Sequence, residues 1–291
     1  MGPWGGGSKI LSSIIDECNS RGHQVCFSFE EKVDLIFCFD PRPSNDCDFQ
    51  KLISLRERDA APVVQRVGDL GTHGKPELFD LVEVTTRISD FVIFPSRWAS
   101  SLLPNVKDKS RVIENAPNKS FFNRNERRKS FHENLKIVTH HWSDNPAKGF
   151  DLYEKFDSYC CSRKDIEFFF VGRKPTKINI KNYYQPMDVQ GLVEFLPDNH
   201  VYLTASKFEA GANHVLEAMA CGLPVLYHRD GGSINEYCSE NGIEYSSFDE
   251  LIYLVEKGRE KLKSLSDKMN YNRNSKDMAR EYVQFFEEIS K

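Results

Sequence analysis

Residues 206–225 read Ser-Lys-Phe-Glu-Ala-Gly-Ala-Asn-His-Val-Leu-Glu-Ala-Met-Ala-Cys-Gly-Leu-Pro-Val. This order of residue types predicts a loop, then a helix, then a buried strand. Asn213 is expected to cap the helix, Gly222 to end it, and Pro224 stands just past its end. Because the start of a helix carries about half a positive charge, the first turn of this helix suits a phosphate group.

Two small residues and two glutamates stand near the start of this helix. Gly211 and Ala212 let backbone N–H groups approach a ligand closely. Glu209 precedes the helix and Glu217 lies one turn inside it, and at about 100° per residue these two positions do not share a helical face. They can contact the same ligand only if Glu209 lies on the loop and Glu217 on the helix. Each carboxylate would then accept hydrogen bonds from hydroxyl groups on a different part of that ligand. Taken alone, each glutamate is better interpreted as a solvent-exposed acid than as a ligand-binding residue. Taken together, the residues of 206–225 indicate a ligand site.

The sequence on both sides of this block alternates predicted helices and strands. In the N-terminal half we expect helices at 8–21, 48–59, 77–89 and 96–103, and strands at 24–29, 33–39, 61–67, 91–94 and 111–114. In the C-terminal half we expect strands at 135–139, 166–171, 193–196, 201–204 and 224–227, and helices at 149–160, 213–221, 248–263 and 275–289. Since the strands are apolar on both faces, they predict parallel sheets covered by helices on both sides.

A polar stretch, 118–134, separates the two halves. Its charge run could bind nucleic acid, but nearby acids favour a solvated linker. We therefore expect an N-terminal domain at 1–123, a second domain at 124–274, and a last helix within 275–291 that crosses back to the first domain. Ligands of such folds bind at the carboxyl ends of the strands, and the cleft between two such domains is the default active site.

Composition narrows the class of protein. The 291 residues carry 39 basic and 43 acidic side chains, a net charge of −4, which is no footprint of a nucleic-acid binder. No apolar run approaches the roughly 20 residues of a membrane span, and the N-terminus lacks the apolar core of a signal peptide. We expect a soluble cytoplasmic protein, with peripheral membrane contact left open. The eight cysteines lack zinc spacing and are expected to be reduced core residues rather than metal ligands or disulfides.

The block at 206–225 resembles the donor-binding signature of retaining glycosyltransferases with the GT-B fold, the group 1, family 4-like enzymes that include glycogen synthases. Their pattern is Glu, seven residues, Glu, then Ala-x-x-x-Gly-x-Pro-Val, and the later residues 231–236 resemble their Gly-Gly turn. The resemblance implies an α/β GT-B fold, with two Rossmann-like domains whose parallel sheets face an interdomain cleft. It implies that Glu209 contacts the donor hexose and Glu217 the nucleotide ribose. The remaining donor-contacting residues implied here are Gly211, Ala212, Asn213 and His214.

A glycine-rich start, Gly5, Gly6 and Gly7, precedes the first predicted helix. It lacks the spacing of a P-loop. In the resembled family, a glycine-rich loop at this place lies against the donor phosphates. Relatives have a full strand before that loop, which this sequence lacks, so we expect either a first domain without its first strand or a natural sequence that starts earlier.

The loop after the strand at 135–139 offers the cations that the family uses on the leaving diphosphate. Lys148, followed by glycine, matches the family's Lys-Gly pair, whereas Ser143 stands where the family has an arginine. We expect Lys148 to supply most of the charge, helped by His140 or His141. Hydrogen bonds at a strand end are the alternative for these histidines.

Two further groups of residues follow predicted strand ends. Gly172 and Arg173 stand where the family has a loop near the nucleotide base, with a solvated loop as the alternative for the arginine. In the first domain, the candidates for the acceptor side are Arg42, Arg66, Asp69 and His73.

These observations predict a retaining glycosyltransferase that moves a hexose from a UDP- or GDP-linked donor to a glycan, lipid-linked or small-molecule acceptor. No metal or separate cofactor is expected, because side chains and the helix dipole supply the positive charge. The alternatives are a nucleotide-sugar epimerase or hydrolase, and a non-catalytic sugar-nucleotide-binding protein. A nicotinamide oxidoreductase is a distant third, since no Gly-x-Gly-x-x-Gly follows a predicted strand.

Overall fold

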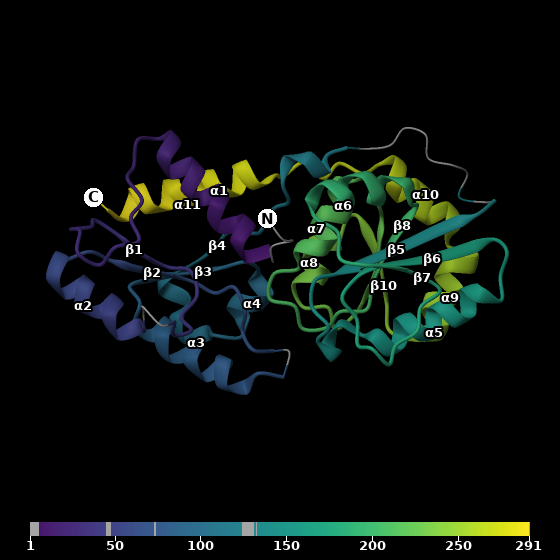
Figure 1. Cartoon of the computed structure of the whole chain (residues 1–291), viewed down its shortest axis with the longest axis horizontal. Coiled ribbons are helices and arrows are strands. Elements are labelled where there is room, and N and C mark those ends of the chain that lie inside the picture. Colours follow the sequence, from purple (N-terminus) through teal and green to yellow (C-terminus); the bar gives the residue numbers. More distant parts are fainter. Residues whose placement is uncertain (1–5, 45–47, 73, 124–130, 132, 291) are drawn as a thin grey trace. The chain divides into compact units, whose positions relative to one another are not determined.

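The computed structural model describes residues 6–44, 48–72, 74–123, 131 and 133–290 (Figure 1). These residues form two compact units, which we name by their sheets. The four-stranded unit comprises Gly6–Ala116 together with the segment from Asn274 onward, and the six-stranded unit comprises Pro117–Arg273. The boundary predicted from the sequence, after residue 123, lies seven residues farther along the chain.

The four-stranded unit contains a fully parallel sheet in the order β1-β2-β3-β4. Its strands are β1 (Ile36–Cys38), β2 (Val63–Arg66), β3 (Phe91–Phe94) and β4 (Ser110–Val112). Its helices are α1 (Gly6–Ser20), α2 (Phe49–Asp59), α3 (Pro76–Ile88), α4 (Arg97–Ser101), the 3₁₀ turn η1 (Pro104–Lys109) and α11 (Ser275–Ile289). Side chains cap two of these helices: Asp48 accepts from the Lys51 N–H at 2.9 Å, and Ser96 accepts from the Ala99 N–H at 3.0 Å.

Successive residues of β2 pack on opposite faces of this sheet. Val64 lies in a buried cluster with α1 and α11, which lie side by side although they come from opposite ends of the chain (Figure 1). Val63 packs instead against Leu55 of α2. Because both faces are covered, the strands read as continuous apolar runs rather than alternating ones.

The six-stranded unit also has a fully parallel sheet, in the order β10-β9-β8-β5-β6-β7. Its strands are β5 (Leu135–His141), β6 (Ile166–Gly172), β7 (Asn182–Tyr184), β8 (Val201–Thr204), β9 (Val225–His228) and β10 (Gly242–Tyr245). Its helices are α5 (Phe150–Cys161), α6 (Val189–Phe195), α7 (Asn213–Ala220), α8 (Ser233–Cys238), α9 (Phe248–Lys257) and α10 (Arg259–Asp267), with 3₁₀ turns η2 (Lys119–Phe121), η3 (Pro146–Lys148) and η4 (Leu196–Asp198).

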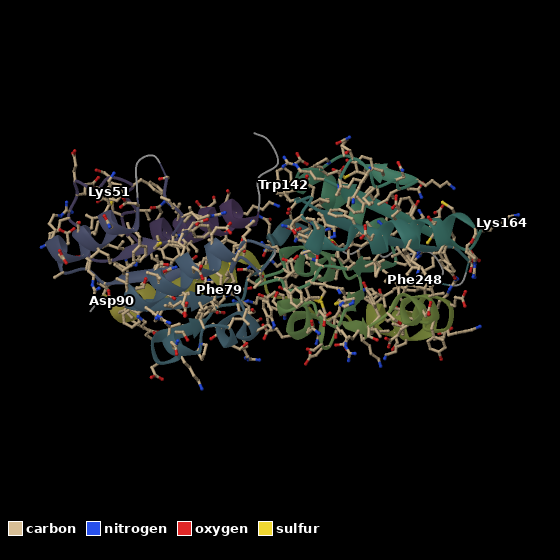
Figure 2. The ribbon with its side chains drawn as sticks, turned by 90° about the horizontal axis from the view of Figure 1, so that it is seen from below. Lys51, Phe79, Asp90, Trp142, Lys164 and Phe248 are labelled. Atoms are coloured by element: carbon tan, nitrogen blue, oxygen red, sulfur yellow. The ribbon has the colours of Figure 1, made fainter. Side chains whose placement is uncertain are left out.

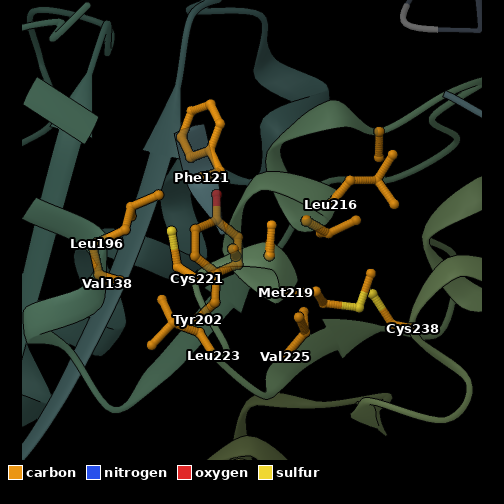
Figure 3. Packing of buried hydrophobic residues seen from close by; sticks show 14 of the residues in the cluster. Phe121, Val138, Leu196, Tyr202, Leu216, Met219, Cys221, Leu223, Val225 and Cys238 are labelled. Atoms are coloured by element: carbon orange, nitrogen blue, oxygen red, sulfur yellow. The ribbon is translucent and has the colours of Figure 1, made fainter. Parts of the chain in front are cut away.

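Two buried clusters cover the two faces of this sheet. Val138 and Tyr202 pack beneath α7, whose Leu216 and Met219 complete the layer (Figure 3). The neighbouring residue Ile137 points to the other face, in a cluster that includes residues of α5 and α9. The parallel, doubly covered sheets expected from the sequence are confirmed in both units.

Several predicted elements are wrong. Residues 24–29 form no strand: they pair with no strand of the sheet, and Phe27 is 76% exposed, although Val25 and Phe29 are partly buried against the core. Residues 193–196 lie in α6 and η4, because a short apolar run fits a buried helix as well as a strand. The helix at 248–263 is divided at Gly258 into α9 and α10. The sequence reading missed β7, β10 and α8, which are three, four and six residues long.

The cap of α7 also differs from the prediction. Asn213 is the first helical residue, and Ala212 occupies the cap position without a side-chain hydrogen bond. The other end is as predicted: Gly222 is left-handed with φ +78°, and its N–H donates to Met219 O at 2.8 Å. The Leu223 N–H donates to Ala218 O at 3.0 Å, which completes a Schellman motif.

The described cysteines are all free, and most of them are buried. None of the helices in the described ranges is long and apolar enough to cross a membrane. Nor do these ranges hold three His, Cys, Asp or Glu side chains grouped as metal ligands.

Candidate active site

Lys148 and Glu209 meet at the carboxyl end of the six-stranded sheet. The Lys148 ammonium forms an ion pair with Glu209 Oε1, although the two residues are 61 positions apart. Both side chains are about 12% exposed. The pair therefore brings together the residue predicted to neutralise a diphosphate and the residue predicted to hold a hexose.

A short 3₁₀ turn positions Lys148. Asn145 caps that turn by accepting from the Ala147 N–H at 2.9 Å. Gly149 follows at φ +79°, and a Cβ there would lie 2.6 Å from Ala205, so a glycine is required by both conformation and space. The Lys207 N–H donates to Ala147 O at 3.0 Å and ties this turn to the loop that carries Glu209.

The Gly231-Gly232 turn holds Glu209 from the other side. The Glu209 N–H donates to Gly231 O at 3.2 Å, and the Ser233 N–H donates to Glu209 O at 2.8 Å. The preceding residue, Phe208, adopts φ +55°, a left-handed conformation that costs a non-glycine residue about 1–3 kcal/mol. The backbone is therefore strained next to the candidate carboxylate. The backbone hydrogen bonds of Glu209 to the Gly231-Gly232 turn hold this conformation in place.

Glu217 contacts a histidine at the end of β5. Its Oε2 lies 2.8 Å from His140 Nε2, across 77 positions of sequence, and both residues are buried. His140 Nδ1 is also buried, and it makes no hydrogen bond within the described parts of the chain. The alternative of purely local hydrogen bonding therefore does not describe His140, because its ring partner comes from α7.

His141 and His214 lie beside each other in the interior, with ring centroids 5.2 Å apart. His141 Nε2 lies 2.7 Å from Tyr153 Oη, and His214 Nε2 lies 3.0 Å from Thr204 Oγ1. Burial, reinforced by the positive charge of Lys148, lowers the pKa of His141 well below its usual 6.5. Burial lowers the pKa of His214 to about 3, because the opposing charge of Glu209 does not compensate for it. A neutral His141 adds no full positive charge, and its contacts in this structure are packing and hydrogen-bonding ones. Its help in compensating the charge of a diphosphate stays a prediction.

The amides before α7 are partly engaged within the protein. The Ala212 N–H donates to Ser233 Oγ at 3.1 Å, so this amide is already satisfied without a ligand. Asn213 Oδ1 is buried and has no hydrogen-bond partner in the described ranges. The start of α7 therefore offers the first-turn amides of the helix, rather than that of Ala212, to an anion.

The loops after β5 and β6 lie against each other. Gly172 has φ +128°, and a Cβ there would stand 1.9 Å from His141 O. The Arg173 guanidinium carbon lies 4.3 Å from the centre of the Trp142 ring, a cation–π contact that the sequence analysis did not anticipate. Figure 2 labels Trp142 at this end of the unit and Lys164, which precedes β6, at the far end. Ser143 Oγ accepts from the Asn145 N–H at 3.2 Å and so shapes the loop that leads to Lys148.

The acceptor-side candidates lie in the four-stranded unit and have different surroundings. Arg42 is exposed and hydrogen-bonds Asp40, with Nε at 2.9 Å from Oδ1. Asp69 Oδ1 accepts from the Gly71 N–H at 2.9 Å, which assigns that carboxylate a turn-forming role. Arg66 is buried and contacts Asn115. Gly5 and His73, which were also predicted site residues, lie outside the described residues; Gly6 and Gly7 begin α1.

No protein-family model and no curated protein matches this sequence. Solved structures do match it. WaaG, a glycosyltransferase involved in lipopolysaccharide biosynthesis, is 15% identical, with a TM-score of 0.61 over 97% of this chain and 93% of that one. HepE from Anabaena, solved with UDP-glucose, is 14% identical, with a TM-score of 0.64 over 88% of this chain and 79% of that one. The chain has the GT-B fold.

A further GT-B neighbour, the pneumococcal O-GlcNAc transferase GtfA solved with UDP and GlcNAc, is 12% identical, with a TM-score of 0.63. The match covers 87% of this chain but 56% of GtfA, so this chain spans little more than half of that protein. The GT-B prediction made from residues 206–225 is confirmed at the level of the fold.

Proposed function

We propose that this chain is a retaining glycosyltransferase that moves a hexose from a nucleotide-diphosphate sugar to an acceptor hydroxyl. The observation that carries the proposal is the Lys148–Glu209 ion pair at the carboxyl end of the six-stranded sheet. It joins the two residue types that such a transfer needs side by side: a cation for the leaving diphosphate and a carboxylate for the sugar hydroxyls.

Each side chain of the site has a proposed task. When the donor binds, Lys148 exchanges Glu209 for the diphosphate, and Glu209 accepts hydrogen bonds from hexose hydroxyls. Glu217, held by His140 at 2.8 Å, accepts from the ribose hydroxyls. The first-turn amides of α7 add positive potential at the diphosphate.

The transfer itself is an exchange of bonds at the anomeric carbon. Its bond to the diphosphate oxygen breaks, the acceptor oxygen bonds to the same face, and the acceptor proton leaves with the diphosphate. Stabilisation of the departing charge by fixed positive groups is the main contribution of the protein, since such groups need no reorganisation during the reaction.

The comparisons support the donor class. HepE was solved with UDP-glucose, and GtfA was solved with UDP and GlcNAc. We propose UDP-linked and GDP-linked hexoses as the first donor substrates to test. The proposed acceptors are glycans, lipid-linked glycans and small hydroxyl compounds.

The first test is a thermal-shift titration of the full chain with UDP, GDP, ADP and CDP and their common sugars. A ligand at a hundred times its Kd stabilises the folded protein by about 2.7 kcal/mol. We expect a selective response to one nucleotide, weakened in Glu217→Ala and retained in Glu240→Ala, a matched change at an exposed glutamate of the same unit. No response to any nucleotide would contradict the proposal.

A second step tests turnover with the selected donor and a panel of acceptors. We expect release of nucleoside diphosphate that depends on an acceptor. Release or epimerisation without acceptor would identify a hydrolase or epimerase instead, and binding without turnover for every acceptor would identify a binding protein.

A further inference from the structure

Arg66 is a buried arginine that has no carboxylate partner among the residues described by the structure. It stands at the carboxyl end of β2 and is 4% exposed. Its Nη2 donates to Asn115 Oδ1 at 3.2 Å, and its guanidinium carbon lies 4.7 Å from the centre of the Phe39 ring. Its Nε is buried and has no hydrogen-bond partner in the parts of the chain that the structure describes. Over the same residues, Arg66 takes part in no ion pair.

Such a charge is costly to bury. Buried charges are normally paired, and a guanidinium carries five N–H donors, of which one here is used by an amide oxygen. A phosphate or carboxylate is the partner that matches the planar fork of an arginine. The buried and underused guanidinium therefore points to an anion that binds from outside the chain.

Gly68 leaves space beside this guanidinium. A Cβ at Gly68 would stand 2.3 Å from Arg66 Nη1. Gly68 is absent from the glycines with positive φ, so the position demands a glycine for space rather than for conformation. The missing side chain lets the backbone approach Nη1, and any larger residue would displace the guanidinium.

The charges around Arg66 favour an anion. The Asp40 carboxylate, which feels the charge of Arg66, is held by Arg42. Burial raises the pKa of Asp40, but the hydrogen bonds from Arg42 and the charges of Arg42 and Arg66 lower it overall. Asp40 therefore stays ionised and engaged with Arg42. The N-terminal turn of α1 also lies close, because a Cβ at Gly7 would stand 3.4 Å from Phe39 Cε1. That turn contributes the positive end of a 15-residue helix.

We propose that Arg66, held by Asn115 and packed against the backbone at Gly68, binds the phosphate group of a phosphorylated acceptor. The acceptor assignment rests on the proposed function, whereas the anion site does not. Inorganic phosphate and glycerol 1-phosphate are therefore suitable probes, and glycerol is the uncharged control. The donor diphosphate is the other source of the same chemistry, and the experiment separates the two.

The test measures phosphate and glycerol 1-phosphate binding to the full chain by thermal shift, at constant ionic strength set with chloride. We expect saturable stabilisation by both anions and none by glycerol. Arg66→Met, which keeps apolar cover for Phe39, should raise the Kd at least about tenfold, the equivalent of one lost charged hydrogen bond. Gly68→Ala should have a similar effect while keeping the charge, so the test remains decisive if Arg66→Met does not fold. Arg87→Met, the matched control at an exposed arginine of the same unit, should change the Kd less than twofold.

A wild-type chain that does not respond to phosphate would overturn the proposal, as would a response lost in Arg87→Met but kept in Arg66→Met and Gly68→Ala. The titration is then repeated with the nucleoside diphosphate at saturation. A phosphate response that persists supports an acceptor site; one that the nucleotide competes away assigns Arg66 to the donor and overturns the acceptor part. The nucleotide response of Arg66→Met, expected to equal that of the wild type, reports separately on the proposed donor site.

Discussion

At the residue scale, the Lys148–Glu209 pair links stability to function. Lys148→Met leaves a carboxylate without its cation, and Glu209→Gln leaves an ammonium without its anion, at positions about 12% exposed. We expect each change to lower the free energy of unfolding by about 1–3 kcal/mol, the cost of an unsatisfied charged group. The double variant should lose clearly less than the sum, and urea denaturation of all four proteins measures the coupling.

Both single variants should also lose most transfer activity while they remain folded, because one removes the charge on the diphosphate and the other the sugar contact. Losing one such electrostatic contact typically costs about 100- to 1000-fold in kcat. Additive stability losses would contradict the ion pair, and wild-type turnover in both variants would contradict the site.

His214 predicts a dependence of stability on pH. Its pKa is about 3 in the folded protein, chiefly through burial, and about 6.5 when unfolded. Between these two pKa values the unfolded chain binds a proton at His214 and the folded chain does not. The contribution of neutral His214 to the free energy of unfolding is therefore complete above pH 6.5 and is lost as the pH falls. At about 1.4 kcal/mol per pH unit, wild type should lose about 2 kcal/mol relative to His214→Gln between pH 7 and pH 5. Urea denaturation of both proteins at several pH values measures this difference, and parallel profiles would contradict it.

At the element scale, Gly149 joins η3 to α5 and fixes Lys148 in place. Gly149→Ala meets a left-handed backbone and a contact of 2.6 Å with Ala205, whereas Gly22→Ala meets a left-handed backbone in open space. We expect Gly22→Ala to cost about 1 kcal/mol and Gly149→Ala about 1–3 kcal/mol more, because overpacking adds to the conformational term. Thermal denaturation checks the order, and only Gly149→Ala should reduce transfer. Equal losses of stability in the two variants would mean that the loop around Gly149 moves away from Ala205 without strain.

The elements that could be predicted from the sequence are those with a long hydrophobic periodicity or with clear helix-capping and turn residues at their ends. α11 was predicted at its observed bounds, because its amphipathic period runs through the whole segment between residues 275 and 289. Strand β7, by contrast, has three residues and no alternation, and its pairing with β6 supplies what the local sequence lacks. Short strands form because they pair with neighbouring strands in the sheet. Local sequence patterns do not show this pairing, so such strands cannot be predicted from them.

The candidate site was predictable only as a set of strand-end residues. The carboxyl ends of parallel strands meet at one edge, so Lys148 and Glu209 could be expected near each other, and they are in contact. The pairing of His140 with Glu217, and the stacking of Arg173 on Trp142, depend on side-chain directions that spacing does not fix. The underused guanidinium of Arg66 is likewise visible only once all of its neighbours are placed.

At the scale of the whole molecule, α11 ties the end of the chain to the four-stranded unit. Its Met278, Tyr282, Val283 and Phe285 are buried in the cluster that includes α1 and β2. Burial of a large apolar side chain stabilises a fold by about 1.5–3 kcal/mol, so these four contribute about 6–12 kcal/mol, as much as the whole stability of a typical domain. A chain that ends at Arg273 should therefore lose the four-stranded unit.

The six-stranded unit should survive that truncation, because it is continuous from Pro117 to Arg273 and its two clusters contain no residue of α11. Hydrogen exchange resolved by peptide measures both halves of the prediction: β2 and β3 should lose their protection, while β5 and β8 keep theirs. A chain ending at Ile289, which retains α11, is the matched control and should exchange like the intact protein. Protection of β2 retained without α11 would show that the sheet and α1 suffice, and α11 would then be a cover rather than part of the core.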